Sequence, residues 1–231
     1  MLASLGRRAA TLLFGGSCFL CQGAAHELLC ESCDADLPRL GSGLCPRCAL
    51  ASPLGAVCGR CLTQPPAYDA TVAALAYAFP ADVLVQALKF RGELALAPFL
   101  GNLLYGCLSG KSVNCIIPVP LSAERLRRRG YNQALEIART VAAATGVRLA
   151  PETCRRTRDT SEQMELPLEE RARNVRGAFE CPRLVEGATV AVLDDVMTTG
   201  ATLQEVAAAL KRAGAARVVN WVVARTFPAH A

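Results

Sequence analysis

Histidine is scarce in this chain of 231 residues, which contains only His26 and His230. Neither forms part of a persuasive Ser-His-Asp or Cys-His set, so nucleophilic catalysis of that kind is not indicated. Aromatic residues make up only 5% of the chain. No apolar run approaches the ~18 residues that a membrane helix needs, and we expect no membrane span.

Charged residues are also few, at 19%, while hydrophobic residues reach 52%. This balance predicts a packed core and excludes a wholly disordered chain. The length is enough for one ordinary domain and a small module. The net charge of +5 and the pI near 8.7 are compatible with an anionic ligand or with nucleic acid, and they decide for neither.

Cysteine, in contrast, is abundant near the N-terminus, where eight of the twelve cysteines form four pairs. The pairs are Cys18 and Cys21, Cys30 and Cys33, Cys45 and Cys48, and Cys58 and Cys61. The two residues inside each pair let both sulfurs face one metal, and two pairs complete a tetrahedral zinc site with four thiolates. Disulfide or redox use is the alternative, but a redox-active pair usually stands alone within a thioredoxin-like βαβ unit, and none surrounds these.

The four pairs predict two structural zinc ions. Consecutive pairing would join the first four cysteines in one site and the last four in the other, while interleaved pairing stays open. His26 could replace one ligand, although eight cysteines already suffice. The N-terminal segment is a poor secretion signal, and without secretion structural disulfides lose their oxidising environment, so we expect a cytoplasmic protein.

The chain divides by composition into residues 1–66, a small double zinc-ribbon module, and residues 67–231, where strands and helices alternate. Strands are expected at 69–77, 113–119, 189–193 and 217–224, and helices at 81–90, 93–108, 133–145 and 202–213. Asn132 stands where it would cap the third of these helices, and Gly146 lies just past its end. The alternation predicts an α/β fold with a mostly parallel sheet flanked by helices.

A short polar segment follows the aliphatic strand at 189–193, and ligands of open α/β sheets bind where strands end. Asp194 and Asp195 leave that strand together, so we expect their side chains to diverge. Small and hydroxylated residues then lead into a helix: Met197, Thr198, Thr199, Gly200, Ala201 and Thr202. The turn at Gly200 and the helix N-terminus form an anion site. Because carboxylates accept from a diol while a phosphate lies in the loop, the segment suits a ribose 5-phosphate.

This segment resembles the signature of type I phosphoribosyltransferases, which bind 5-phosphoribosyl diphosphate (PRPP). The resemblance implies that Asp194 and Asp195 are the catalytic pair that holds the ribose hydroxyls. It also implies that residues 197–202 cradle the 5-phosphate. The expected fold is accordingly that of a type I phosphoribosyltransferase, with the small zinc-ribbon module in front.

A second strand end resembles the loop that binds diphosphate in that fold. Pro120, Leu121 and Ser122 would expose amides to the leaving diphosphate, with Mg²⁺ bridging its oxygens. Alternatively, the prolines only end the strand and Ser122 caps a helix.

The run of arginines at 125–129, interrupted only by Leu126, is the densest basic segment. Arg129 or a neighbour completes the diphosphate site, or the run follows a nucleic-acid backbone. A solvated helix face is the third interpretation. Few aromatics accompany these arginines, with Tyr131 the nearest, so a stacking platform for single strands is poorly supported.

Further positions narrow the resemblance from the phosphoribosyltransferase fold to one family. They are residues 118–121 (Pro-Val-Pro-Leu), Arg125, Arg127, residues 129–133 (Arg-Gly-Tyr-Asn-Gln), Arg156, Thr157, Gln163, Leu166, Arg171, Asn174 and Phe179. Together with the cysteine module, they make the chain similar over nearly its whole length to the ComF family of competence and DNA-utilisation proteins.

The ComF resemblance implies a role in natural transformation or in the use of DNA as a nutrient. The implied partners are PRPP, incoming single-stranded DNA, the DNA-uptake ATPase and recombination proteins. Residues 155–177 form a long polar segment, and long loops in compact domains are usually functional. By the resemblance, the part around Gln163 would close over the site as a lid and exclude water.

Three functions are compatible with these observations. The first is an active phosphoribosyltransferase with an unidentified acceptor, in which positioning and charge stabilisation drive displacement of magnesium diphosphate from the ribose. The second is a PRPP-binding competence factor that handles single-stranded DNA. The third is a zinc-stapled adaptor with a vestigial pocket, against which the intact acids and threonine loop argue. We expect the second, with the first as the alternative.

Overall fold

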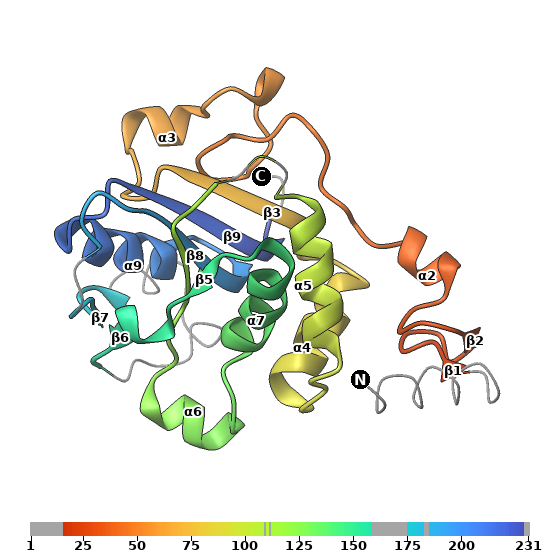
Figure 1. Ribbon diagram of the computed structural model, residues 1–231. Coiled ribbons are helices and arrows are strands. Elements are labelled where there is room, and N and C mark those ends of the chain that lie inside the picture. The colour runs from red at the N-terminus through yellow and green to blue at the C-terminus, as the bar shows by residue number, and fades with distance from the viewer. Residues whose placement is uncertain (1–15, 109, 111, 159–174, 183–184, 229–231) are drawn as a thin grey trace.

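A five-stranded parallel sheet forms the centre of the molecule (Figure 1). The computed structural model describes residues 16–108, 110, 112–158, 175–182 and 185–228. The strands lie in the order β3 (Ala70–Ala76), β9 (Arg217–Arg225), β8 (Thr189–Met197), β4 (Cys115–Pro118) and β5 (Arg148–Leu149). Every pairing between neighbours is parallel, which confirms the predicted α/β class.

Two layers of helices cover the sheet. One face carries α4 (Ala81–Phe90), α5 (Leu96–Gly106) and α7 (Gln133–Thr145), and the other carries α9 (Ala201–Arg212). The side chains of the central strands alternate between these layers: Ala191 and Leu193 pack with α5 and α7, while Val190 and Val192 pack with α9. Strands buried on both faces explain the continuous aliphatic runs in the sequence.

The predicted helices and strands are present, with small shifts at their ends. Helix α4 has the predicted bounds, while α5 is shorter than the segment 93–108 that we expected. Asn132 caps α7 as predicted, because its Oδ1 accepts from the backbone N–H groups of Ala134 at 3.0 Å and Leu135 at 3.4 Å. Gly146 ends the helix in the left-handed conformation, with φ of 72°.

The end of β8 differs from the prediction. We expected the strand to stop at Leu193, but it continues to Met197 and includes both aspartates. Its ladder with β4 ends at the pair Pro118 and Leu193, whereas its ladder with β9 continues to the pair Met197 and Arg225. One neighbour therefore keeps the strand extended while the other turns away, which opens the sheet between β4 and β8.

This opening lies at the point where the chain reverses direction across the sheet. From β4 the chain crosses through α7 to β5 at one edge, and from β8 it crosses through α9 to β9 on the other side. Such a switch point is where open α/β sheets bind their ligands.

The cysteine-rich segment forms two small units outside the sheet. The first contains the hairpin of β1 (Gly16–Ser17) and β2 (Ala24–Ala25) and the helix α2 (Glu31–Ala35). The second contains the 3-10 turn η1 (Pro53–Gly55) and the helix α3 (Gly59–Thr63). They lie on different sides of the molecule, with α2 beside α4 and α5 and α3 beyond β3 (Figure 1). The chain between them pairs with the sheet edge, since Leu40 donates to the Ala74 carbonyl at 2.9 Å and Ala76 donates to Pro38 at 2.8 Å.

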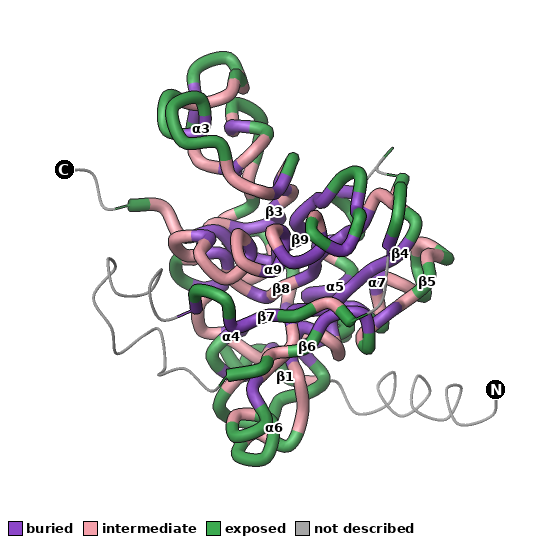
Figure 2. The backbone as a smooth tube through the Cα atoms, turned by 90° about the vertical axis from the view of Figure 1, so that its left-hand side faces the viewer, coloured by how far each residue is buried: buried purple, intermediate pink, exposed green. Residues whose placement is uncertain are grey.

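Four short elements lie outside the central sheet on the side of β4 and β5. The arginine run forms α6 (Ala123–Arg129), and α3 and α6 project at opposite ends of the molecule (Figure 2). The strands β6 (Arg155–Arg156) and β7 (Phe179–Glu180) pair antiparallel, and η2 (Pro151–Thr153) precedes them. The start of the segment 155–177, predicted as a long loop, thus pairs with residues just beyond its end, and residues 159–174 lie outside the described part of the chain. No helix of the described residues is both long and apolar enough to span a bilayer.

Replacing Asn132 by alanine should lower the free energy of unfolding by about 1–2 kcal/mol, because α7 loses its cap. The amide of Asn132 also donates to the Val119 carbonyl at 3.0 Å, so the same change releases the chain after β4. Urea unfolding followed by circular dichroism measures the effect.

The matched control is Asn102→Ala, at an exposed position inside α5. This change should leave stability unaltered or raise it by less than about 0.7 kcal/mol, since alanine is the better helix former. Equal unfolding free energies for the two variants would contradict the capping role of Asn132.

Candidate ligand pocket and metal centres

A pocket lies at the switch point between β4 and β8. Its walls come from α4, from the turn after β4, from α6, from β6 and from the end of β8. Several residues that we predicted for the site line it: Pro120, Leu121, Arg129, Asp194, Asp195, Thr198 and Thr202. Residues from widely separated parts of the sequence thus meet at the expected edge of the sheet.

The two aspartates have different surroundings within the pocket. Asp195 is 2% exposed, and the Lys89 ammonium lies 2.8 Å from its Oδ2. Removal from water raises the pKa of Asp194 well above its usual range, and the neighbouring Asp195 carboxylate raises it further, while Lys89 opposes both effects. The ammonium of Lys89 therefore faces two adjacent carboxylates.

Hydrogen bonds to the strand backbone fix the orientation of both carboxylates. Asp194 Oδ1 accepts from the N–H of Asp195 at 2.9 Å, and Asp195 Oδ1 accepts from the N–H of Val196 at 2.7 Å. These bonds occur where β8 has lost its partner β4. Each aspartate thus accepts from the N–H of the residue that follows it, and the other oxygen of Asp195, Oδ2, pairs with Lys89.

The loop between β8 and α9 has the form of an anion site. Gly200 has φ of 85°, and a Cβ there would lie 2.7 Å from the Met197 Cε and 3.2 Å from the Tyr68 Oη. Only glycine fits this close approach. Thr199 Oγ1 accepts from the N–H of Ala201 at 3.3 Å, and the twelve-residue α9 begins at Ala201. The amides at the start of α9 favour an anion.

The side chain of Met197 lies beneath the loop between β8 and α9. This side chain is 1% exposed and packs under Gly200, so Met197 contributes to the loop through its backbone alone. Thr198 and Thr202 are the residues of the segment 197–202 whose atoms line the pocket.

The turn after β4 contributes Pro120 and Leu121 to the pocket, but Ser122 does not line it. Ser122 is buried, and its hydroxyl accepts from the N–H of Arg125 at 3.4 Å as the N-cap of α6. The capping role that the sequence left open for Ser122 is therefore present in the structure.

Arg129, at the end of α6, lies between an aromatic ring and a buried amide. Its guanidinium donates to Gln133 Oε1, and its Cζ lies 5.5 Å from the centre of the Phe90 ring. Burial lowers the pKa of Arg129, and the negative charge of Asp195 counteracts that effect. Lys89, Arg125, Arg129 and Arg156 all line the pocket, so four cations accompany the two acids. This charge suits a ligand with several negative charges.

Some pocket residues could not be found from the sequence. They are Tyr77, Lys89 and Phe90, whereas Gln133 and Arg156 were singled out only as positions of the family resemblance and not as site residues. Lys89 is held in place because the Tyr131 hydroxyl donates to the carbonyl of the preceding residue, Leu88. Gln163, the predicted lid residue, lies outside the described residues.

The eight paired cysteines form two groups of four. The first metal centre comprises Cys18, Cys21, Cys30 and Cys33, and the second comprises Cys45, Cys48, Cys58 and Cys61. All ligand atoms within a group lie within 4.8 Å of one another. This is the consecutive arrangement of the pairs, and His26 belongs to neither group.

The donor set fits zinc. A tetrahedral ion with Zn–S bonds of 2.3 Å places its sulfurs about 3.8 Å apart. The Sγ atoms of Cys21 and Cys30 lie 3.7 Å apart, and so do those of Cys48 and Cys58. Four sulfur ligands leave no open coordination position, so each centre is structural rather than catalytic.

Family comparisons agree with both parts of the chain. Residues 9–62 match the Double zinc ribbon domain, and residues 128–226 match the Phosphoribosyl transferase domain. Adenine phosphoribosyltransferase from Thermoanaerobacter pseudethanolicus aligns with a TM-score of 0.37 and 15% identity, over 59% of this chain and 84% of that chain. The parallel sheet, the matched domains and the two centres define a phosphoribosyltransferase-like protein with a double zinc ribbon.

Relatives of known name align along almost the whole chain. DNA utilization protein YhgH of Salmonella typhimurium is 35% identical over 223 residues, covering 92% of this chain and 98% of that protein. Competence protein F of Haemophilus influenzae is 30% identical over 226 residues, with the same coverage. The chain belongs to the ComF/YhgH family.

Asp194→Asn should stabilise the unliganded protein at neutral pH. Because the pKa of Asp194 is raised, the folded protein holds this proton more tightly than the unfolded chain does. The stability that Asp194 contributes is therefore present at acidic pH and is lost as the pH rises through the raised pKa. Removing the charge should raise the thermal midpoint at pH 7, with a smaller gain toward pH 4.

Scanning calorimetry across this pH range measures the difference, with Asp36→Asn at an exposed position as the control. A lower midpoint for Asp194→Asn at pH 7, or a difference that does not change with pH, would show that the folded protein does not disfavour the charged form of Asp194.

Proposed function

We propose that this chain binds PRPP with Mg²⁺ at the switch-point pocket and that it acts in natural competence or DNA utilisation by handling incoming single-stranded DNA. The observation that carries the proposal is the oriented acid pair at the end of β8, next to a glycine loop that opens a helix. The family names of the relatives support the cellular role.

The acid pair and the loop would hold opposite ends of the sugar. The carboxylates of Asp194 and Asp195 accept from the ribose hydroxyls, which share Asp195 Oδ2 with Lys89. The 5-phosphate lies against the amides of residues 198–202 at the N-terminus of α9, where the helix favours negative charge. The threonine hydroxyls of Thr198 and Thr202 add polar contacts from the pocket wall.

The diphosphate would extend toward the turn after β4. Pro120 and Leu121 line that side, and Arg129 reaches it from α6. Mg²⁺ bound with the ligand would neutralise diphosphate oxygens, which it prefers as ligands. Lys89, which pairs with Asp195 in the unliganded protein, lines the same pocket and would also bind the diphosphate.

A second cavity adjoins the first and suits a single strand of nucleic acid. It is lined by Lys89, Phe90, Arg128, Arg129 and Tyr131, together with Gly92. Phe90 is 52% exposed and stands beside Arg129, so an aromatic surface accompanies the arginine run, which the sequence did not indicate. Bases stack on exposed rings while arginines follow the phosphates. The DNA-uptake ATPase and recombination proteins are proposed protein partners on the family relationship alone.

An active phosphoribosyltransferase is the second candidate. The observation in its favour is that the acids and Arg129 line one pocket, so that they can act on the same ribose diphosphate. Catalysis would then consist of positioning and of charge stabilisation on the departing diphosphate. Release of diphosphate from PRPP upon addition of an acceptor base distinguishes this candidate from binding alone.

PRPP should bind in the presence of Mg²⁺, and the double variant Asp194→Asn with Asp195→Asn should weaken binding at least about 100-fold. Each hydrogen bond to a charged group contributes about 1.5–3 kcal/mol, and two are lost. Titration calorimetry gives both affinities.

The control for this experiment is Asp34→Asn with Asp36→Asn, which removes two carboxylate charges, one inside α2 and one at its C-cap, in the first metal module. Unchanged affinity in the Asp194 and Asp195 double variant would remove the pocket assignment. Equal loss in the control variant would show that net charge, rather than the acid pair, governs binding.

A labelled oligothymidylate should bind with an affinity that falls as salt increases, and Phe90→Ala should weaken this binding by ~5-fold or more, because stacking of one base contributes about 1–3 kcal/mol. Fluorescence anisotropy measures the affinity, and PRPP added in competition tests whether the strand reaches the ribose pocket.

Phe79→Ala is the matched control, since Phe79 is 77% exposed but lines neither cavity. Equal affinities of the Phe90→Ala and Phe79→Ala proteins for the oligonucleotide would exclude the second cavity as the binding surface.

A further inference from the structure

One buried cation connects the second metal centre to residues 198–200, the loop between β8 and α9, here termed the phosphate loop. Arg225 is the last residue of β9 and is 1% exposed. Its Nε donates to the Cys48 carbonyl at 2.9 Å, and its Nη1 donates to the Met197 carbonyl at 2.8 Å and to the Thr198 carbonyl. A third bond from Nη1 reaches the Thr226 carbonyl at 2.8 Å. The same guanidinium therefore holds a cysteine of the metal centre and the residues that begin the loop.

The charge of Arg225 has no carboxylate partner in the described part of the chain, where none of the ion pairs involves it. A buried cation needs nearby negative charge to remain favourable. Four thiolates around one Zn²⁺ carry a net charge of −2, and the second centre lies directly beside the guanidinium through Cys48. A zinc-loaded second centre thus supplies the compensating charge.

Other contacts join the second centre to the same region. The N–H of Thr71 donates to the Pro46 carbonyl at 2.9 Å, which ties the segment between Cys45 and Cys48 to β3. Tyr68 is buried and lies under Gly200 in the phosphate loop. Ala49, next to Cys48, packs in the apolar core that also contains Met197. These contacts pack the loop between β8 and α9 against the region that carries the second metal centre.

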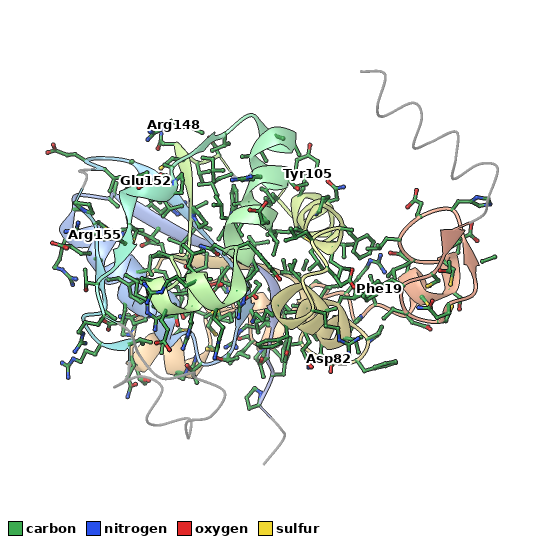
Figure 3. All side chains as sticks on the ribbon, turned by 90° about the horizontal axis from the view of Figure 1, so that it is seen from below. Phe19, Asp82, Tyr105, Arg148, Glu152 and Arg155 are labelled. Carbon is green, nitrogen blue, oxygen red and sulfur yellow. The ribbon has the colours of Figure 1, made fainter. Side chains whose placement is uncertain are left out.

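The first metal centre has a different neighbourhood. Cys18 belongs to the apolar core on the side of α4 and α5, and Phe19 packs against the same core (Figure 3). In Figure 1 its helix α2 lies on another side of the molecule from α3. The two centres have the same ligands but touch different parts of the sheet domain, which makes each a control for the other.

We infer that Arg225 is a positioning residue through which the second metal centre supports the loop that borders the proposed ribose-phosphate pocket. Zinc at this centre keeps Arg225 in place, and Arg225 holds the carbonyls of Met197 and Thr198 so that the amides of residues 198–202 face the ligand. The effect on ligand affinity rests on the proposed function, whereas the effect on the loop itself does not.

The first arm of the test compares one ligand of each centre. Cys58→Ser and Cys21→Ser should each lose one zinc by metal analysis. With ribose 5-phosphate as the probe in titration calorimetry, Cys58→Ser should weaken binding by ~10-fold or more and Cys21→Ser by less than ~2-fold, the larger loss being the effect of one good interaction. Equal weakening by the two variants would overturn the inference.

The second arm needs no ligand. Hydrogen–deuterium exchange at the amides of residues 198–202 should speed up in Cys58→Ser and in Arg225→Lys, because lysine cannot reach all the carbonyls that the guanidinium holds. Arg225→Lys should keep both zinc ions. The combined variant should exchange no faster than the faster single variant, since both changes break one connection.

Unchanged exchange at these amides in Arg225→Lys would overturn the inference, even if Cys58→Ser proved too unstable to study. Faster exchange in a protein that binds no ribose 5-phosphate would instead remove the proposed function and leave the link between zinc and loop in place.

Discussion

The site depends on two adjacent carboxylates held where the sheet opens. Asp194 and Asp195 lie on β8 beyond the end of β4, and the Lys89 ammonium pairs with Asp195. Burial and mutual repulsion disfavour the charged form of Asp194, so the arrangement opposes stability in the unliganded protein. Proteins tolerate such opposition at functional sites, and a diol that donates to both acids would relieve it. The unfavourable charge is therefore itself an argument for a ligand.

The rest of the architecture keeps this opening in one shape. The ladder with β9 continues to Met197 and keeps the acids on an extended strand, while the cap at Asn132 fixes the chain after β4 through the Val119 carbonyl. Arg225 holds the loop between β8 and α9 by donating to the carbonyls of Met197 and Thr198. In this account the second metal centre serves the pocket, and the first supports the helices that cover the other face of the sheet.

Local patterns in the sequence predicted the elements and the metal sites well. The cysteine spacings, the aliphatic strands and the capping pair Asn132 and Gly146 depend on near neighbours, and the structure contains each of them. Contacts across the fold were not predictable in this way. Lys89 meets Asp195 from over a hundred residues away, and Arg225 meets Cys48 only because β9 ends beside the second centre. The strand boundary at Leu193 was wrong because pairing with β9 outlasts pairing with β4.

In the proposed site, the peptide amides at the start of α9 receive the phosphate of a ribose ligand. Two-dimensional ¹H–¹⁵N correlation spectra recorded during addition of ribose 5-phosphate test it most directly. The account predicts the largest, saturable shifts at the amides of residues 198–202, with smaller changes near Asp194 and Asp195. Saturable shifts that leave these amides unmoved would contradict it.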